Sequence, residues 1–218
     1  LVPNLLNALV GLVAGALARL REAGQVVVFR DIDAPMPRDE FLSALPGVDA
    51  LVAMLVDRVD AEVLDAAGPG LRVVANVAVG YDNVDVAACR ERGVLVTNTP
   101  GVLTDATADI AMSLILMSTR GLGAAERRVR TGVPWRWSLT AYLGVGLRGK
   151  TLGIGGPGAI GLATARRAKA FGMDVLLSGR SSPDPAVVET LGARVVELDE
   201  LLTASDVVSL HCPLTPAT

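Results

Sequence analysis

Three glycines in the stretch GGPGAIG have the spacing of a phosphate-binding loop. Gly156, Gly158 and Gly161 form G-x-G-x-x-G between a predicted strand and a predicted helix. In such a loop the first glycine makes a tight turn, the second lets the backbone approach a pyrophosphate, and the third packs the helix against the strand. The amides of Ala159 and Ile160 would face the phosphates at the positive end of the helix dipole. Glycine-rich turns are common, but this context favours dinucleotide binding over a structural turn.

The segment that should choose between the two nicotinamide dinucleotides lies about 20 residues further along. An acid there would hold the ribose 2′-hydroxyl of NAD, but the segment LLSGRSS has Gly179, Arg180, Ser181 and Ser182 instead. A carboxylate repels a 2′-phosphate, whereas a guanidinium and two hydroxyls can bind one. The predicted cofactor is therefore NADP in preference to NAD. The alternative is that these residues form an ordinary solvated loop.

Composition narrows the class of partner. Charged residues make up 20% of the 218 residues, the net charge is −3, and no block of like charges occurs. Nucleic acids and anionic membrane surfaces need concentrated Lys and Arg, so neither is predicted as a partner. The two cysteines, Cys89 and Cys212, show no C-x-x-C spacing. This disfavours a disulfide framework or a metal site and favours a reducing cytoplasm as the location.

The first 18 residues carry no charge and raise the question of a membrane segment. A span needs about 20 predominantly apolar residues. Here Pro3, Asn4 and Asn7 lie near the start, and the apolar run from Ala8 to Ala18 is short. We therefore predict a buried helix and no membrane partner, with a signal sequence or membrane anchor as the alternative.

Short apolar runs alternate with helical patterns along most of the chain. Strands are predicted at 25–29, 50–55, 72–79, 93–98, 150–156, 174–179, 193–198 and 206–211. This alternation predicts an α/β fold with parallel sheets covered on both faces. One long helical pattern over 105–132 and an irregular segment with two tryptophans join the two blocks. Cys89 falls in the middle of a helical pattern and is predicted to be a small core residue.

The phrases VGYDN, VTNTPGVLTDATAD and LHCPLT, together with the glycine loop, resemble the D-isomer-specific 2-hydroxyacid dehydrogenases in order and spacing. Within that family the likeness is nearest to the glyoxylate and hydroxypyruvate reductases, and it covers about residues 25–218. The resemblance implies two flavodoxin-like or Rossmann-like domains with parallel sheets. Residues 1–98 would be most of the substrate-binding domain. Residues 99–218 would be the NAD(P)-binding domain, incomplete at its C-terminus.

The resemblance also implies a substrate pocket. The turn Val79–Gly80 would offer backbone N–H groups to the substrate carboxylate, and Leu55 would line the apolar side of the pocket. The alternative for Gly80 is a glycine that ends a strand, and for Leu55 a residue of the core. The implied substrate is a small 2-keto or 2-hydroxy acid, with glyoxylate or hydroxypyruvate favoured.

Three further positions are implied to line the cofactor site. Thr104 would reach the nicotinamide side of the cofactor, with a helix cap as its alternative. Cys212 and Pro213 follow a predicted parallel strand, where ligands bind in open α/β sheets. The family histidine in LHxPLT is not the acid that protonates the substrate, so His211 is not expected to be catalytic.

The family's catalytic arginine, glutamate and histidine come later in its sequence than the segment matched by Thr218. We therefore expect no catalytic residue among these 218, and no turnover by this chain alone. The whole protein is expected to be an oxidoreductase acting on the CH–OH group of its donor, and a homodimer joined in part by the segment Trp135 to Leu147. The alternative is a nucleotide-sensing binding protein of the same fold, like the corepressors that resemble this family.

Overall fold

The computed structural model describes residues 15–16, 18–22, 24, 36–213, 215 and 218. The chain divides into two compact units, Leu1–Thr99 and Pro100–Thr218, which are described separately below. The predicted strand at 25–29 lies outside the described residues, and so does most of the apolar segment 1–18. In the described ranges, no helix is both long enough and apolar enough to cross a membrane.

The first unit contains a three-stranded parallel sheet with the order β1-β2-β3. Its strands are β1 (Ala50–Ala53), β2 (Val73–Asn76) and β3 (Leu95–Thr97). The helices between and before them are α2 (Arg38–Ser43), α3 (Ala61–Ala67) and α4 (Val86–Glu91). Each strand is shorter than its apolar run, because the run continues into the turn that follows the strand.

Side-chain caps start two of these helices, where the sequence places acids. Asp60 accepts a hydrogen bond from Val63 N at the start of α3, and Asp85 accepts one from Ala88 N at the start of α4. Such caps satisfy amides that have no partner inside the helix. The apolar faces of both helices pack into one core. Cys89 is fully buried there, which confirms its prediction as a core residue.

The second unit contains a four-stranded parallel sheet with the order β6-β5-β4-β7. Its strands are β4 (Thr151–Gly155), β5 (Asp174–Ser178), β6 (Arg194–Val195) and β7 (Val207–Leu210). Its helices are α5 (Thr104–Arg120), α6 (Leu122–Arg130), α7 (Ala159–Ala170), α8 (Pro185–Leu191) and α9 (Leu198–Ala204). In chain order this sheet reads third, second, first, fourth, which is one half of a dinucleotide-binding fold followed by the first strand of the other half. The prediction of an α/β fold with parallel sheets is confirmed.

The prediction of one long helix over 105–132 is wrong. The helix breaks at Gly121, which has a left-handed φ of 62° and donates its N–H to Met117 O. A residue with a Cβ is strained at that angle, so glycine ends α5 there and α6 starts at the next residue. The strand predicted at 193–198 is also shorter, because only Arg194 and Val195 pair with β5.

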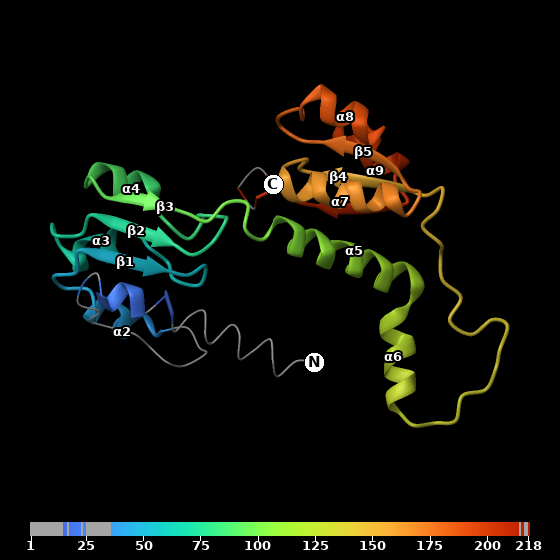
Figure 1. Ribbon diagram of the computed structural model, residues 1–218, viewed down its shortest axis with the longest axis horizontal. Helices are drawn as coiled ribbons and strands as arrows, with labels where there is room; N and C mark the ends of the chain where they lie inside the picture. The colour runs from blue at the N-terminus through green and yellow to red at the C-terminus, as the bar shows by residue number, and fades with distance from the viewer. Residues whose placement is uncertain (1–14, 17, 23, 25–35, 214, 216–217) are drawn as a thin grey trace. The chain divides into compact units, whose positions relative to one another are not determined.

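Helices α5 and α7 pack against each other in the second unit (Figure 1). The guanidinium of Arg167 on α7 donates to Asp109 Oδ1 at 2.6 Å and to Asp105 Oδ1 at 3.0 Å, both on α5. It also donates to Ala163 O at 3.0 Å within its own helix. These bonds fix the first turns of α5 beside the helix that carries the glycine loop.

Candidate functional site

The glycine loop leaves β4 at the sheet edge where the carboxyl ends of β5 and β7 also lie. Gly156 has a φ of 90° and donates its N–H to Ser178 O at the end of β5, at 2.8 Å. A Cβ on Gly156 would lie 2.6 Å from Cys212 N and 2.8 Å from His211 C. Both the backbone angle and the close approach of the chain after β7 therefore require glycine here.

The other two glycines of the loop have different surroundings. A Cβ on Gly161 would lie 2.5 Å from Gly156 O and 3.0 Å from Ile154 Cγ2, so its absence lets α7 pack closely on β4. For Gly158, no described atom lies within 4 Å of the Cβ position. The protein itself does not fill that side of Gly158, which leaves room for a ligand to approach the backbone.

The first turn of α7 presents free hydrogen-bond donors beside this space. Gly158 N donates to Gly156 O, and Leu162 N donates to Gly158 O. Within the described part of the chain, the N–H groups of Ala159, Ile160 and Gly161 have no acceptor. Free amides at the positive end of a 12-residue helix favour an anion in front of them.

The predicted 2′-phosphate segment follows β5 and borders the loop. A Cβ on Gly179 would lie 2.6 Å from Pro157 Cδ, so the two backbones approach closely. Arg180, Ser181 and Ser182 are exposed. Among the residues with described positions, Arg180 has no carboxylate partner, which leaves its guanidinium available to an anion.

The chain after β7 passes close to Gly156 at the same sheet edge. His211 N donates to Gly155 O at 2.7 Å, and His211 Nε2 lies 3.0 Å from Ser209 Oγ. Burial lowers the pKa of the half-buried His211, and no described carboxylate contacts its ring. The ring therefore lacks, among the described residues, the carboxylate that orients a catalytic histidine. Cys212 and Pro213 are exposed at this edge.

Thr104 is the first residue of α5 rather than its cap. The cap position is Leu103, and no side chain caps this helix. The helix-cap alternative for Thr104 is therefore wrong. Its neighbour Asp105 is bonded to Arg167, so the start of α5 is fixed relative to α7 and its glycine loop.

The turn at residues 78–82, here called the amide turn, has four of its five carbonyls bonded and its amides free. The carbonyls of Ala78 and Val79 accept from Thr99 N at 2.8 Å and Asn98 Nδ2 at 2.9 Å. The next two, at residues 80 and 81, accept from Asn76 Nδ2 at 2.9 Å and Val84 N at 3.0 Å. None of the five N–H groups has an acceptor among the described residues. Successive free N–H groups are an arrangement suited to an anion.

The structure bears on the alternatives for two substrate-pocket residues, Leu55 as a residue of the core and Gly80 as a glycine that ends a strand. Leu55 is 58% exposed in the turn after β1, so its reading as a core residue is wrong. Gly80 does not have a positive φ, and a Cβ there would lie 3.1 Å from Asp82 Oδ1. Backbone strain therefore does not explain this glycine. The exposed carboxylate of Asp82 is a negative charge that an anion at the amide turn would meet.

The structure thus brings the predicted cofactor residues of the second unit, apart from Thr104 on α5, to one sheet edge. It brings the predicted substrate residues of the first unit to two turns that Asn83 joins. Sequence reasoning missed Asn76, Asn83 and Asn98, which bond to those turns. A signal for Asn76 was present, because an amide in the run RVVANVAV is an uncommon choice for a buried strand.

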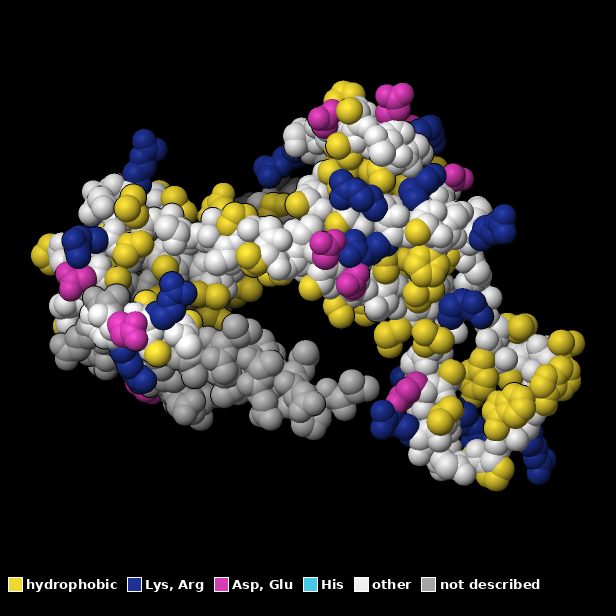
Figure 2. All heavy atoms as spheres, viewed as in Figure 1, with side chains coloured by type: hydrophobic (Ala, Val, Ile, Leu, Met, Phe, Trp, Pro, Cys, Tyr) yellow, Lys and Arg dark blue, Asp and Glu magenta, His cyan; other side chains and the backbone are white. Residues whose placement is uncertain are grey.

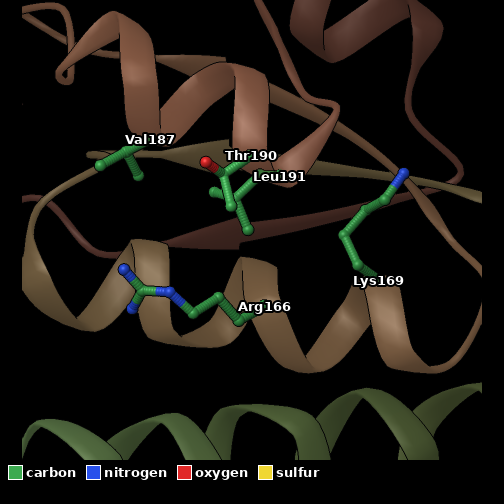
Figure 3. Close-up of a pocket in the computed structure, with 5 residues that line it drawn as sticks. All are labelled: Arg166, Lys169, Val187, Thr190 and Leu191. Atoms are coloured by element: carbon green, nitrogen blue, oxygen red, sulfur yellow. The ribbon is translucent and has the colours of Figure 1, made fainter.

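A separate groove with a volume of about 360 Å³ lies between α7 and α8 (Figure 3). It is lined by Arg166, Lys169, Val187, Thr190 and Leu191. Figure 3 shows the charged ends of Arg166 and Lys169 pointing to opposite ends of the groove. Because these polar groups do not converge, the groove lacks the arrangement typical of a small-molecule site.

Comparisons with known proteins show the family of this chain. The family model for the D-isomer specific 2-hydroxyacid dehydrogenase catalytic domain matches residues 8–205. A glyoxylate reductase from Thermococcus litoralis is 46% identical over 199 residues, which are 89% of this chain and 59% of that protein. This chain therefore spans about three fifths of the length of the curated relatives that it matches.

Solved structures show the same similarity in three dimensions. The TT0316 protein from Thermus thermophilus is 46% identical, with a TM-score of 0.84 over 94% of this chain and 63% of that one. A glyoxylate reductase from Paecilomyes thermophila is 34% identical, with a TM-score of 0.73 over 83% of this chain and 56% of that one.

Proposed function

Since this chain belongs to the D-isomer specific 2-hydroxyacid dehydrogenases, an NAD(P)-dependent family of oxidoreductases, we propose that its second unit binds a nicotinamide dinucleotide and its first unit a small 2-keto acid. The dinucleotide supplies the hydride for reduction of such an acid. The observation that carries the proposal is that each unit presents a row of free backbone amides, at Ala159 to Gly161 and at the amide turn.

The pyrophosphate would lie against the first turn of α7. The free amides there can donate to its oxygens, and the open side of Gly158 admits it to the backbone. Cys212 and Pro213 would form one wall of this cofactor site. Thr104 would face the nicotinamide side of the same cofactor.

The preferred dinucleotide would be NADPH, because Arg180 is exposed and has no acidic partner among the described residues. Its guanidinium, with the hydroxyls of Ser181 and Ser182, can hold a 2′-phosphate. Arg180→Ala should raise the Kd for NADPH by about tenfold and leave that for NADH unchanged, since an exposed charge-assisted hydrogen bond is worth about 1.5 kcal/mol. Arg166→Ala is the matched control, because this exposed arginine lies in the same unit on α7. Equal weakening of both cofactors by Arg180→Ala would contradict the preference.

The substrate carboxylate would bind the free amides of the amide turn. The exposed side chain of Leu55 would line the apolar side of the substrate pocket. Both groups fit a small acid such as glyoxylate or hydroxypyruvate. The name of the relative from Thermococcus litoralis, a glyoxylate reductase, supports the first of these.

Reduction also needs a cation to polarise the ketone and an acid to protonate the new alkoxide. His211 is the only histidine of the sequence, and no described carboxylate orients it. We propose that these 218 residues hold the binding groups and not the acid–base pair. The 218-residue chain should bind NADPH without reducing glyoxylate. Oxidation of NADPH by the purified chain above an enzyme-free control would contradict this proposal.

The whole protein would be a homodimer formed in part through the segment from Trp135 to Leu147. Figure 2 shows hydrophobic side chains gathered there, next to α6. Trp135 and Trp137 are 68% and 73% exposed. Tryptophans that are exposed in a single chain often become buried anchors when a protein interface forms. Sedimentation of the full-length protein as a monomer at micromolar concentration would contradict this assembly.

A further inference from the structure

The direction of the peptide groups in the amide turn is fixed by the donors that bond to their carbonyls. A planar trans peptide points its C=O and the following N–H in opposite directions. When a donor inside the unit holds the carbonyl of one residue, the N–H of the next residue must point away from that donor. The donors that bond to the carbonyls of the turn therefore decide which N–H groups face outward.

Two asparagine side chains supply these donors. Asn98 Nδ2 holds Val79 O at 2.9 Å, which turns the N–H of Gly80 outward. Asn76 Nδ2 holds Gly80 O at 2.9 Å, which turns the N–H of Tyr81 outward. Without these donors the carbonyls would be free to rotate toward solvent, and the amides would lose their common direction.

A third asparagine joins the amide turn to the turn that carries Leu55. Asn76 and Asn83 are bonded to each other, with both amide contacts at 3.1 Å. Asn83 Nδ2 also donates to Met54 O and to Asp57 O, both at 3.0 Å. Asn76 is 2% exposed, so its amide contacts are shielded from water and hold one geometry.

We infer that Asn76 and Asn98 are positioning residues for the acid-binding amides at Gly80 and Tyr81, and that Asn83 couples them to the wall at Leu55. This inference rests on the proposed function of the amide turn. None of the three side chains needs to touch the acid, because each acts through the carbonyl that it holds. Their loss weakens binding of a carboxylate without changing the dinucleotide site, whose residues lie in the other unit.

The test is a titration of the ¹⁵N-labelled 218-residue chain with oxamate, an unreactive 2-keto acid analogue, followed through the backbone amide resonances. In the unsubstituted chain the resonances of residues 78–82 should shift and saturate. Asn98→Leu keeps about the size of an exposed side chain, removes its donor and adds no charge beside the anion, and should raise the Kd for oxamate by roughly twofold to twelvefold, about 0.5–1.5 kcal/mol for one hydrogen bond. Asn76→Ala removes a buried donor and should raise the Kd by tenfold or more.

Leu64→Ala is the matched control for stability alone. Leu64 is buried on α3 in the same unit and has no hydrogen bond to the amide turn. It should lower the stability of the unit and leave the Kd for oxamate unchanged, while NADPH binds all four proteins equally. If Asn76→Ala does not fold, Asn98→Leu decides the matter, because Asn98 is exposed.

The outcomes separate this inference from the proposed function. Unchanged oxamate affinity in folded Asn98→Leu and Asn76→Ala would overturn the inference and leave the amide turn as the acid site. No shift at residues 78–82 in the unsubstituted chain would remove the site, and the inference with it. Equal weakening by Leu64→Ala would show that the asparagines act through stability alone.

Discussion

Gly158→Ala tests the dinucleotide site at a position that the protein itself leaves open. The backbone at Gly158 has a φ of −80° and a ψ of −166°, an extended conformation that alanine also adopts. No described atom lies within 4 Å of the new methyl group. Alanine is a poorer helix cap than glycine, but it also restricts the unfolded chain, and these effects of about 0.5–1 kcal/mol oppose each other. The free energy of unfolding should therefore change by less than about 1 kcal/mol.

The same methyl group should interfere with a pyrophosphate. It occupies the side from which the phosphates would approach the amides of Ala159 and Ile160. Loss of one charge-assisted hydrogen bond costs about 1.5–3 kcal/mol, so the Kd for NADPH should rise by roughly tenfold or more. A fluorescence titration with NADPH measures this affinity, and urea unfolding of the same samples measures stability.

Gly161→Ala is the matched comparison, because there the protein fills the space. Its methyl group would lie 2.5 Å from Gly156 O, a backbone atom that cannot move without moving the turn. Overpacking of this kind costs about 1–3 kcal/mol, and the better helix propensity of alanine returns about 1 kcal/mol. This variant should lose stability, whereas Gly158→Ala should lose only affinity. A folded Gly158→Ala protein that binds NADPH with the original Kd would refute the assignment of this loop.

Two further predictions concern a thiol and a carboxylate of the described chain. Cys212 is exposed beside the glycine loop, whereas Cys89 is buried and burial raises its pKa. One thiol per native chain should therefore react with a disulfide reagent, and saturating NADPH should slow that reaction. An unchanged rate would exclude Cys212 from the cofactor site. The hydrogen bonds from Lys150 Nζ and Thr151 N, both at 2.9 Å, hold the pKa of Asp206 below its usual value. Because the pKa of Asp206 is lower in the folded chain than in the unfolded chain, its ionised carboxylate stabilises the fold above about pH 4. This stabilisation is lost as the pH falls through the pKa of the folded chain. Across that pH range, the free energy of unfolding in urea should depend less on pH for Asp206→Asn than for the unsubstituted chain. Identical pH profiles of the two proteins would contradict this role of Asp206.

Local patterns in the sequence carried much of the fold. The alternation of apolar runs and helical patterns predicted parallel sheets, and acids at Asp60 and Asp85 marked the starts of helices that they cap. The spacing of the three glycines located the loop between β4 and α7. These features were readable because strands, caps and tight turns are decided by residues a few positions apart.

The break at Gly121 was also local but was not predicted. Glycine is tolerated inside helices at a cost of about 1 kcal/mol, so the helical pattern on both sides outweighed it. Only the left-handed angle that the chain adopts there shows that α5 ends. Likewise, the sequence offers Thr104 as a helix cap, whereas the structure places Leu103 at the cap position.

The sequence by itself determined the family, the α/β class and the residues that could bind phosphate. Only the tertiary structure decided which backbone amides are free. That outcome depends on hydrogen bonds between residues far apart in the sequence, such as those from Asn98 to Val79 and from Asn83 to Met54. The tertiary structure also placed the chain after β7 against Gly156, so that three strand ends meet at one edge. A sequence lists donors and acceptors, but the folded chain decides which of them are used up and which remain for a ligand.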